Sequence, residues 1–167
     1  MGRYYATAQG ESQEIADAIR DHYKPLGASD SVPESTLAAI IAIADKLDSI
    51  TSLFAVGEKP TGSKDPLALR RAALGVLRIQ LKHDWNLDLT KFGASTEVIE
   101  FFYERWKQAM RDDGVPIDII EAIGKTDAAL APTKSQKASW VLKNWVTTAT
   151  GKTTLAAIKR ASNILSA

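Results

Sequence analysis

A run of basic residues in a turn-rich segment offers the clearest chemistry in this sequence. Residues 57–66 combine lysines with glycine, proline, serine and threonine, and two adjacent arginines follow in the next predicted helix. The basic side chains of this region are Lys59, Lys64, Arg70 and Arg71, with Arg78 and Lys82 further along. Lysines on an irregular loop can follow a phosphate backbone, and free N–H groups at a helix start add donors. The segment therefore predicts contact with RNA phosphates.

The same segment also allows a purely structural interpretation. Asp65 directly precedes Pro66, and this pair is a strong signal for a helix start. The carboxylate would accept hydrogen bonds from the first N–H groups, while proline at the first helical position loses no bond. One arginine could then pair with an acidic residue of the preceding helix. On this interpretation the loop is a rigid connection, and the sequence leaves both interpretations open.

Two stretches imitate a phosphate-binding P-loop without completing the pattern. Val146–Thr153 ends in Gly-Lys-Thr, but valine occupies the place of the first glycine and a helical segment precedes it instead of a strand. Gly57–Lys64 has both glycines but places Ser63 where the pattern needs lysine. Nucleotide hydrolysis at Gly151-Lys152-Thr153 is therefore the least favoured of the functions considered.

Other residues capable of catalysis or metal binding favour structural roles. Asp45 and Asp48 share a helix face and could bind a metal, but a solvated or Lys46-paired face is favoured. His22 and His83 fall on different predicted helices, so each is expected at a helix end or in packing. The four tryptophans have helical spacing and are expected in the core. The sequence predicts no catalytic or metal-binding residue.

Composition indicates a soluble globular chain of one or two small domains. The 167 residues are 45% hydrophobic, which is enough to form a core, and no apolar run is long enough to span a membrane. The N-terminus lacks the apolar stretch of a signal peptide. Without cysteine there can be no disulfide or thiolate metal site, and a reducing, cytoplasmic compartment is expected.

The net charge of +1 conceals an uneven distribution of charge along the chain. Residues 1–56 carry four basic and eight acidic side chains, whereas residues 57–83 carry six and two. Residues 84–133 carry five and ten, and residues 134–167 carry six basic side chains and no acidic one. Such blocks could pair within the fold or leave two basic surfaces facing a phosphate backbone, and charge alone favours pairing.

Helical periodicity and caps predict an all-α, multi-helix fold. We find no alternation of apolar and polar residues long enough for a strand. The predicted helices, named by their residue ranges, are 12–23, 33–54, 65–83, 95–113, 116–123, 135–148 and 153–165. The helix at 65–83 is apolar on most sides and should be central, with Ala73 and Gly75 allowing close approach of a neighbour. A boundary is predicted within 124–133.

Several of these segments resemble the β subunit of the bacterial two-subunit glycyl-tRNA synthetase. The resemblance is most specific in three consecutive blocks, Ala42–Asp48, Gly57–Pro66 and Ala68–Ile79. Weaker similarity extends it over nearly the whole chain, in Met1–Ala6, Gln9–Glu11, His22–Pro25, Asn86–Leu89, Phe101–Asp118 and Lys159–Leu165. The final third, including Trp140 and Trp145, departs from the family pattern.

The resemblance implies an internal fragment of a larger subunit. Residues 1–56 look like the C-terminal half of an HD-type helical domain, in which Asp45 would be a vestigial closing aspartate whose partner ligands precede Met1. Residues 57–131 resemble the helical body, with the basic loop at 57–65. Residues 132–167 resemble a terminal helix pair that approaches an anticodon-binding domain. No metal is therefore expected in this chain.

The implied function is a share in glycine–tRNA ligase, an aminoacyl-tRNA synthetase of the bacterial cytoplasm. The resemblance implies that the chain binds tRNA(Gly) and scaffolds glycylation, with the synthetase α subunit as partner. ATP and Mg²⁺ would bind in the holoenzyme and not in this chain. No membrane or DNA partner is expected. The alternative from the residues themselves is a helical protein-interaction module without direct RNA contact.

Overall fold

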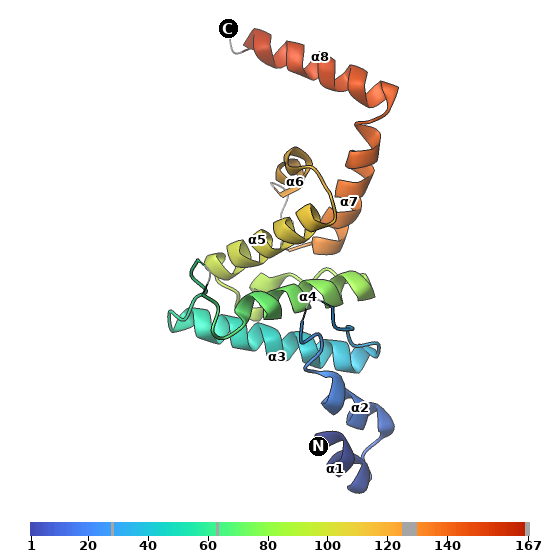
Figure 1. Ribbon diagram of the computed structural model, residues 1–167, viewed down its shortest axis with the longest axis vertical. Coiled ribbons are helices and arrows are strands. Elements are labelled where there is room, and N and C mark those ends of the chain that lie inside the picture. The colour runs from blue at the N-terminus through green and yellow to red at the C-terminus, as the bar shows by residue number, and fades with distance from the viewer. Residues whose placement is uncertain (28, 63, 125–129, 166–167) are drawn as a thin grey trace.

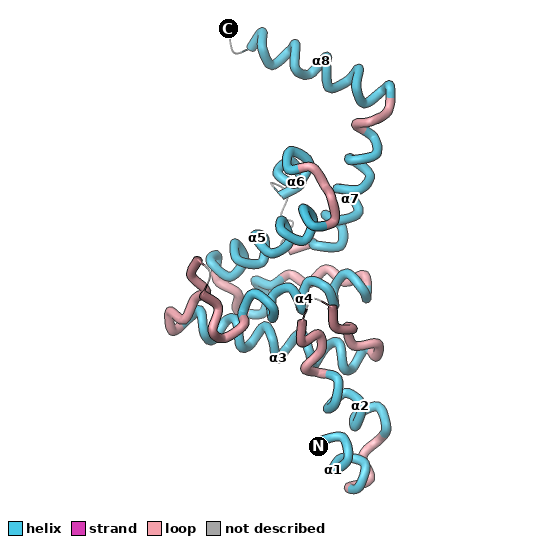
Figure 2. The backbone as a smooth tube through the Cα atoms, in the orientation of Figure 1, coloured by secondary structure: helices cyan, strands magenta, loops and turns pink. Residues whose placement is uncertain are grey.

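The structure, a computed structural model, is an elongated array of helices, which confirms the all-α prediction (Figures 1 and 2). It describes residues 1–27, 29–62, 64–124 and 130–165. The helices within these ranges are α1 (Gly2–Ala8), α2 (Gln13–Asp21), α3 (Thr36–Ala55), α4 (Leu69–His83), the short 3₁₀ helix η1 (Leu89–Phe92), α5 (Thr96–Asp112), α6 (Ile117–Gly124), α7 (Pro132–Trp145) and α8 (Ala149–Leu165). The two termini lie at opposite ends (Figure 1).

A core of three helices holds the middle of the molecule together. Helix α4 packs between α3 and α5 and also contacts α7, so the prediction that it is central is confirmed. The largest fully buried side chains include Trp106 and Phe102 of α5, Ile50 of α3 and Leu77 of α4. Because residues before and after position 56 share this core, α3 and α4 fold as neighbours. The domain boundaries at 56 and 131 stay predictions.

A buried lysine connects α2, α3 and α4. Lys46 of α3 is only 7% exposed, and its Nζ donates hydrogen bonds to the carbonyl oxygens of His22 (3.2 Å) and Tyr23 (3.1 Å). These carbonyls follow the end of α2, where a helix leaves its acceptors without partners. Burial lowers the pKa of Lys46, although the nearby carboxylate of Asp45 opposes this shift.

Gly75 provides the space through which this lysine passes. A Cβ atom at Gly75 would lie 3.1 Å from Lys46 Cε and 3.4 Å from Pro25 Cδ. The predicted role of Gly75 in close approach is therefore confirmed, and the group that approaches is the aliphatic stem of a charged side chain.

The N-terminal helix α1 is an element that the sequence patterns did not predict. It has seven residues and no side-chain cap, so it lacks the signals that mark a helix start. It is held on α2 by an ion pair between Arg3 and Asp17, whose Nε and Oδ1 lie 2.6 Å apart, and by burial of Ala6. Tertiary contacts thus stabilise a helix that its own sequence only weakly favours.

The break between the last two helices lies a few residues earlier in the chain than the sequence patterns predicted. Helix α7 ends at Trp145 and α8 begins at Ala149, so Gly151 lies inside α8 and not at the break. Thr148 Oγ1 accepts from Gly151 N (3.0 Å) and donates to Trp145 O (2.7 Å). A Cβ at Gly151 would lie 2.2 Å from that same carbonyl oxygen. Residues 125–129, within the predicted boundary, lie outside the described residues.

Substituting Gly75 tests how the three helices fit together. We expect Gly75→Val to lower the free energy of unfolding by about 1–3 kcal/mol, because the added carbons collide with the stem of Lys46. In a Lys46→Ala background the same substitution should have a smaller effect, since the colliding atoms are gone. Urea unfolding of the four variants of this cycle measures the coupling. Strictly additive effects would contradict the contact.

Candidate nucleic-acid interface

The basic loop is joined to α4 through a cap at Asp65. The Asp65 carboxylate accepts hydrogen bonds from Leu69 N (2.8 Å) and Arg70 N (3.0 Å), which confirms the predicted cap. The helix nevertheless begins at Leu69 and not at Pro66. Residues 65–68 form a turn in which Ala68 takes a left-handed conformation with φ of 56°, so proline lies in the turn and not in the first helical turn.

Arg70 fastens the tip of this loop to the helix. Thr61 and Lys64 exchange backbone hydrogen bonds of 3.1 and 2.8 Å around Gly62, which has φ of +48°. The Arg70 guanidinium then donates to Gly62 O (2.6 Å) and to Lys64 O (3.5 Å). Carbonyl oxygens satisfy N–H groups without neutralising the cation. Arg70 therefore orders the loop and keeps its full charge there.

Two of the six predicted RNA contacts form ion pairs within the fold. Lys59 Nζ lies 2.7 Å from a carboxylate oxygen of Glu97, in the first turn of α5. Lys82 Nζ lies 3.6 Å from Glu34, which precedes α3. Both pairs are at the surface, where an ion pair contributes little to stability and can exchange with another anion.

The remaining predicted residues differ in how firmly they are held. Arg78 donates to the carbonyl oxygens of Gly27 (2.9 Å) and Asp30 (2.6 Å), and so holds the loop between α2 and α3. Lys64 and Arg71 are exposed, and within the described ranges neither side chain makes a hydrogen bond or ion pair. These two side chains are therefore the ones most available to a phosphate.

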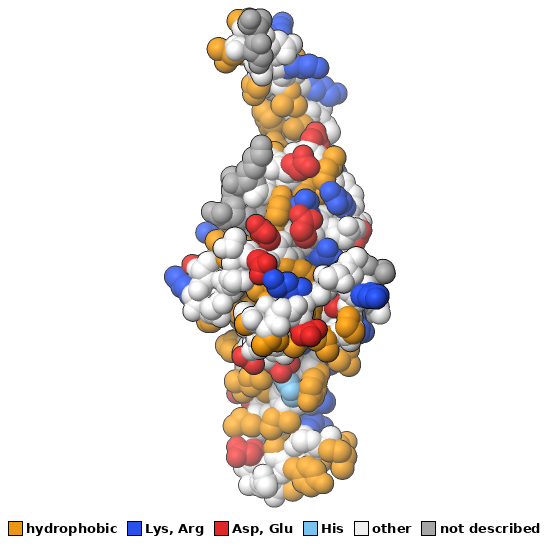
Figure 3. Space-filling model, turned by 90° about the vertical axis from the view of Figure 1, so that its left-hand side faces the viewer, with side chains coloured by type: hydrophobic (Ala, Val, Ile, Leu, Met, Phe, Trp, Pro, Cys, Tyr) orange, Lys and Arg blue, Asp and Glu red, His pale blue; other side chains and the backbone are white. Residues whose placement is uncertain are grey.

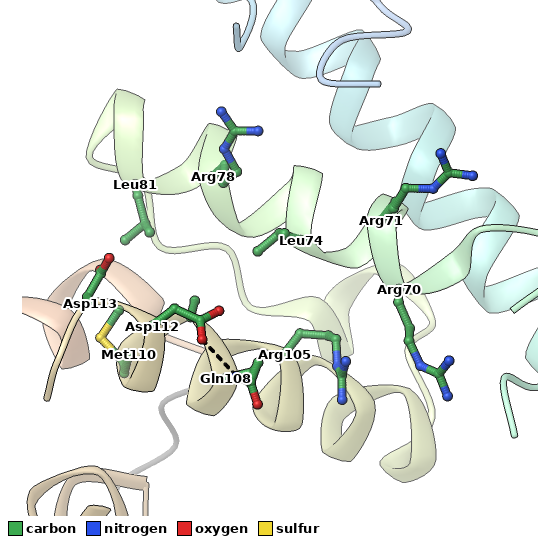
Figure 4. A pocket seen from close by; sticks show the side chains of 11 residues that line it. Arg70, Arg71, Leu74, Arg78, Leu81, Arg105, Gln108, Met110, Asp112 and Asp113 are labelled. Atoms are coloured by element: carbon green, nitrogen blue, oxygen red, sulfur yellow. Dashed lines mark hydrogen bonds between the residues drawn. The ribbon is translucent and has the colours of Figure 1, made fainter. Parts of the chain in front are cut away.

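A cleft of about 380 Å³ lies between α4 and α5 and gathers four arginines (Figure 4). Three of them, Arg70, Arg71 and Arg78, come from α4, and Arg105 comes from α5. No carboxylate lies within ion-pair distance of any of the four among the residues that the structure describes. Asp112 and Asp113 also line this cleft, so its attraction for anions is greatest at the end where the arginines extend into it.

Sequence reasoning missed Arg105 because it stands in the acidic block of residues 84–133. It reaches the cleft only because α5 packs along α4, and no local pattern around it marks a binding residue. Its guanidinium lies 5.9 Å from the ring centroid of Phe101, one turn earlier in α5. Their spacing of four residues places them on one side of the helix and can be seen in the sequence. The packing of that side against α4 cannot.

Residues considered for catalysis take structural positions. His22 Nδ1 lies 2.9 Å from Ile19 O, and His83 Nε2 lies 2.9 Å from Pro33 O with its ring stacked on Trp85, as helix-end and packing roles predict. Asp45 and Asp48 are exposed, while Lys46 turns into the core instead of lying between them. In the described part of the chain no group of His, Asp and Glu could hold a metal ion.

The tryptophans divide between core and surface. Trp106 is fully buried, as predicted. Trp140 is 37% exposed, which corrects the expectation of burial, and Lys143 Nζ lies 4.4 Å from its ring centroid. Trp140 does lie in a helix, as its spacing indicated, but the side of α7 that carries it is partly exposed to solvent. The Gly-Lys-Thr sequence around Gly151 lies within α8, and helix α7 precedes it, so a P-loop geometry is ruled out.

The Asp65 cap can be separated from the surface ion pair of the same loop. Asp65→Ala should lower the free energy of unfolding by about 0.5–2 kcal/mol, because Leu69 N and Arg70 N lose their acceptor. Asp65→Asn keeps one acceptor oxygen and should recover much of this loss. Lys59→Ala, the control, should change stability little. The measurement is urea unfolding, and a control effect as large as that of Asp65→Ala would contradict the cap.

Sequence comparison gives this geometry a family. A family profile described as "Glycyl-tRNA synthetase beta subunit" matches residues 1–125. The glycine–tRNA ligase β subunit of Phenylobacterium zucineum (strain HLK1) is 46% identical over an alignment of 170 residues, which covers 100% of this chain and 25% of that relative. The corresponding subunit of Paracoccus denitrificans (strain Pd 1222) is 45% identical, with coverage of 99% and 25%.

The alignments cover nearly all of this chain but only part of each relative. This chain spans a quarter of the length of each of these two relatives. The profile match covers the loop and the Asp65 cap, and also α4 and α5, whose side chains line the arginine cleft. On the extent of the profile and the level of identity, the chain belongs to the glycyl-tRNA synthetase β subunit family.

Proposed function

We propose that this chain binds tRNA(Gly) and scaffolds its ATP-dependent glycylation as part of a glycine–tRNA ligase β subunit. One observation supports this proposal above the others. Lys64, Arg70 and Arg71, at the loop and the start of α4, form no ion pair with any described carboxylate, and Lys64 and Arg71 are exposed. Phosphate groups are the anions that RNA presents in a regular series, and charge contacts with them supply much of the affinity for nucleic acids.

The loop geometry suits a contact that positions RNA and does not read its sequence. Lys64 sits at the tip of a turn that Arg70 fixes, and Arg71 follows at the start of α4. Cations on an ordered backbone lose less conformational entropy on binding than cations on a free loop. Contacts of this kind set the orientation of the nucleic acid and carry no base specificity. Recognition of tRNA(Gly) would then depend on other parts of the synthetase.

Family membership supports the proposed partners and cofactors. We expect the α subunit to bind glycine and ATP with Mg²⁺ and to form the adenylate, while this chain supplies no catalytic group. The proposed compartment is the bacterial cytoplasm. None of the described helices combines the length and apolar character that a bilayer crossing requires.

A second function, a protein-interaction module, is favoured by apolar surface at the two ends of the molecule. Tyr4, Tyr5 and Leu26 are 63–70% exposed near α1 and α2, and hydrophobic side chains gather at that end in Figure 3. Ile158 of α8 is 58% exposed. Exposed apolar clusters of this kind mark surfaces that other protein segments cover. This role is compatible with tRNA contact on the middle of the molecule.

Salt-dependent binding of tRNA(Gly) tests the RNA contact. The double variant Lys64→Gln/Arg71→Gln should bind more weakly, and the slope of log K against log salt should fall by about 0.7–0.9 for each lost contact. Lys91→Gln/Arg111→Gln removes the same charge from exposed positions elsewhere and serves as the control. Equal affinity and slope for the two double variants would mean that the loop only connects α3 to α4.

Catalysis by this chain alone is tested separately. Because no nucleotide-binding loop or metal-holding group exists among the described residues, the purified chain should show no glycine-dependent pyrophosphate exchange and no ATP hydrolysis. Adding the α subunit supplies the positive control. Exchange activity in the purified chain would overturn the assignment of adenylation to the α subunit.

A further inference from the structure

The cleft between α4 and α5 has two chemically different ends. Figure 4 shows the side chains of Arg70 and Arg105 extending toward one end, while Asp112 and Asp113 lie at the other end of the α5 segment. Asp112 accepts a hydrogen bond from Gln108 Nε2 (2.8 Å) and is turned to its own helix. Arg71 and Arg78 point away from α5 in the same view. Positive charge is therefore concentrated where α4 begins.

Arg105 is poised as a donor at this end. Its Nε is buried and makes no hydrogen bond with any group of the described chain. A buried N–H without an acceptor costs free energy, and most such groups in proteins find a partner. The contact with Phe101 orients the guanidinium, because the ring supports one face of the planar group and leaves its edge for an acceptor. Arg105 also lines the cleft, so an oxygen acceptor that enters between α4 and α5 would meet its guanidinium.

The charge on Arg70 adds to that of Arg105. Arg70 donates to the carbonyl oxygens of Gly62 and Lys64, and neither guanidinium forms an ion pair within the part of the chain that the structure describes. The parallel N–H groups of an arginine guanidinium match the spacing of phosphate oxygens. Two guanidinium groups carry two positive charges, whereas one carboxylate carries a single negative charge. A phosphate carries several acceptor oxygens and, in a polyphosphate, more than one negative charge.

We propose that Arg105 of α5 and Arg70 of α4 form a phosphate-binding pocket at the basic end of this cleft. Arg105 supplies one edge of its guanidinium, and Arg70 supplies charge from a position that its bonds to the loop fix. The pocket would extend the contact surface from the exposed face of α4 onto α5. The assignment of this phosphate to tRNA rests on the proposed function. The binding of a phosphate group by the two arginines does not depend on it.

Binding of sodium tripolyphosphate to the 167-residue chain tests the pocket itself. Arg105→Gln should weaken binding about tenfold, which is the scale of a lost hydrogen bond to a charged group. Arg111→Gln removes the same charge from an exposed position on α5 outside the cleft and should change the affinity by less than about twofold. Arg105→Met keeps the stem against Phe101 and should behave like Arg105→Gln, which covers a failure of either variant to fold.

The anion and its source are distinguished by two further arms. Sodium acetate at equal ionic strength should not raise the melting temperature of the wild-type chain, whereas tripolyphosphate should. If the phosphate is that of tRNA, tripolyphosphate competes with tRNA(Gly) for the wild-type chain, and Arg105→Gln lowers the tRNA salt slope by about 0.7–0.9. If the source is a free polyphosphate group, Arg105→Gln loses tripolyphosphate but binds tRNA normally. Both results support the pocket.

The outcomes that overturn the proposal differ from those that overturn the tRNA function. Equal tripolyphosphate affinity in the wild type and in a folded Arg105 variant would remove the pocket, as would an equal response to acetate. Normal tRNA binding by Lys64→Gln/Arg71→Gln together with loss of tripolyphosphate by Arg105→Gln would instead reject the loop contact and leave the pocket in place.

Discussion

A single buried ammonium group links the three helices α2, α3 and α4 in the first half of this molecule. Lys46 leaves α3, crosses the space that Gly75 provides in α4, and ends on the carbonyl oxygens that follow α2. One side chain thereby contacts parts of three helices. Burying a charge is costly unless it is well hydrogen-bonded, so this connection tolerates little variation in geometry. Together with the apolar core, this contact sets where α4 and its arginines lie.

Helix α4 combines two roles that usually belong to different elements. Its inner side carries Val76, Leu77 and Ile79 into the core, and its outer side presents arginines toward a cleft and a loop. The fold uses carbonyl oxygens to hold Arg70 and Arg78, which orders the side chains without cancelling their charge. A surface formed in this way is both positive and rigid, which are the two properties that favour binding of a phosphate chain.

Local signals in the sequence predicted the parts of the fold that local physics determines. Asp65 caps α4 as its position indicated, and Ser12, Ser35 and Ser95 accept hydrogen bonds from the N–H groups three residues later, close to the predicted helix starts. The start of α4 was placed too early because proline after a cap residue also suits a turn. Arg105 could not be found, since its role arises only from the packing of α5 against α4. The six predicted RNA contacts stay predictions.

The direction of α8 depends on Gly151 having only a hydrogen atom as its side chain, because a Cβ atom there would collide with the Trp145 carbonyl oxygen. Helix α8 packs closely against no other described helix, so its seventeen residues form a rod of about 25 Å held at one end. A change of about 20° in the angle between α7 and α8 would move the far tip by roughly 9 Å. The contact between the Trp145 carbonyl and Gly151 thus sets the angle between α7 and α8. A small change in packing at this contact would be amplified into a large displacement of the C-terminal end of α8.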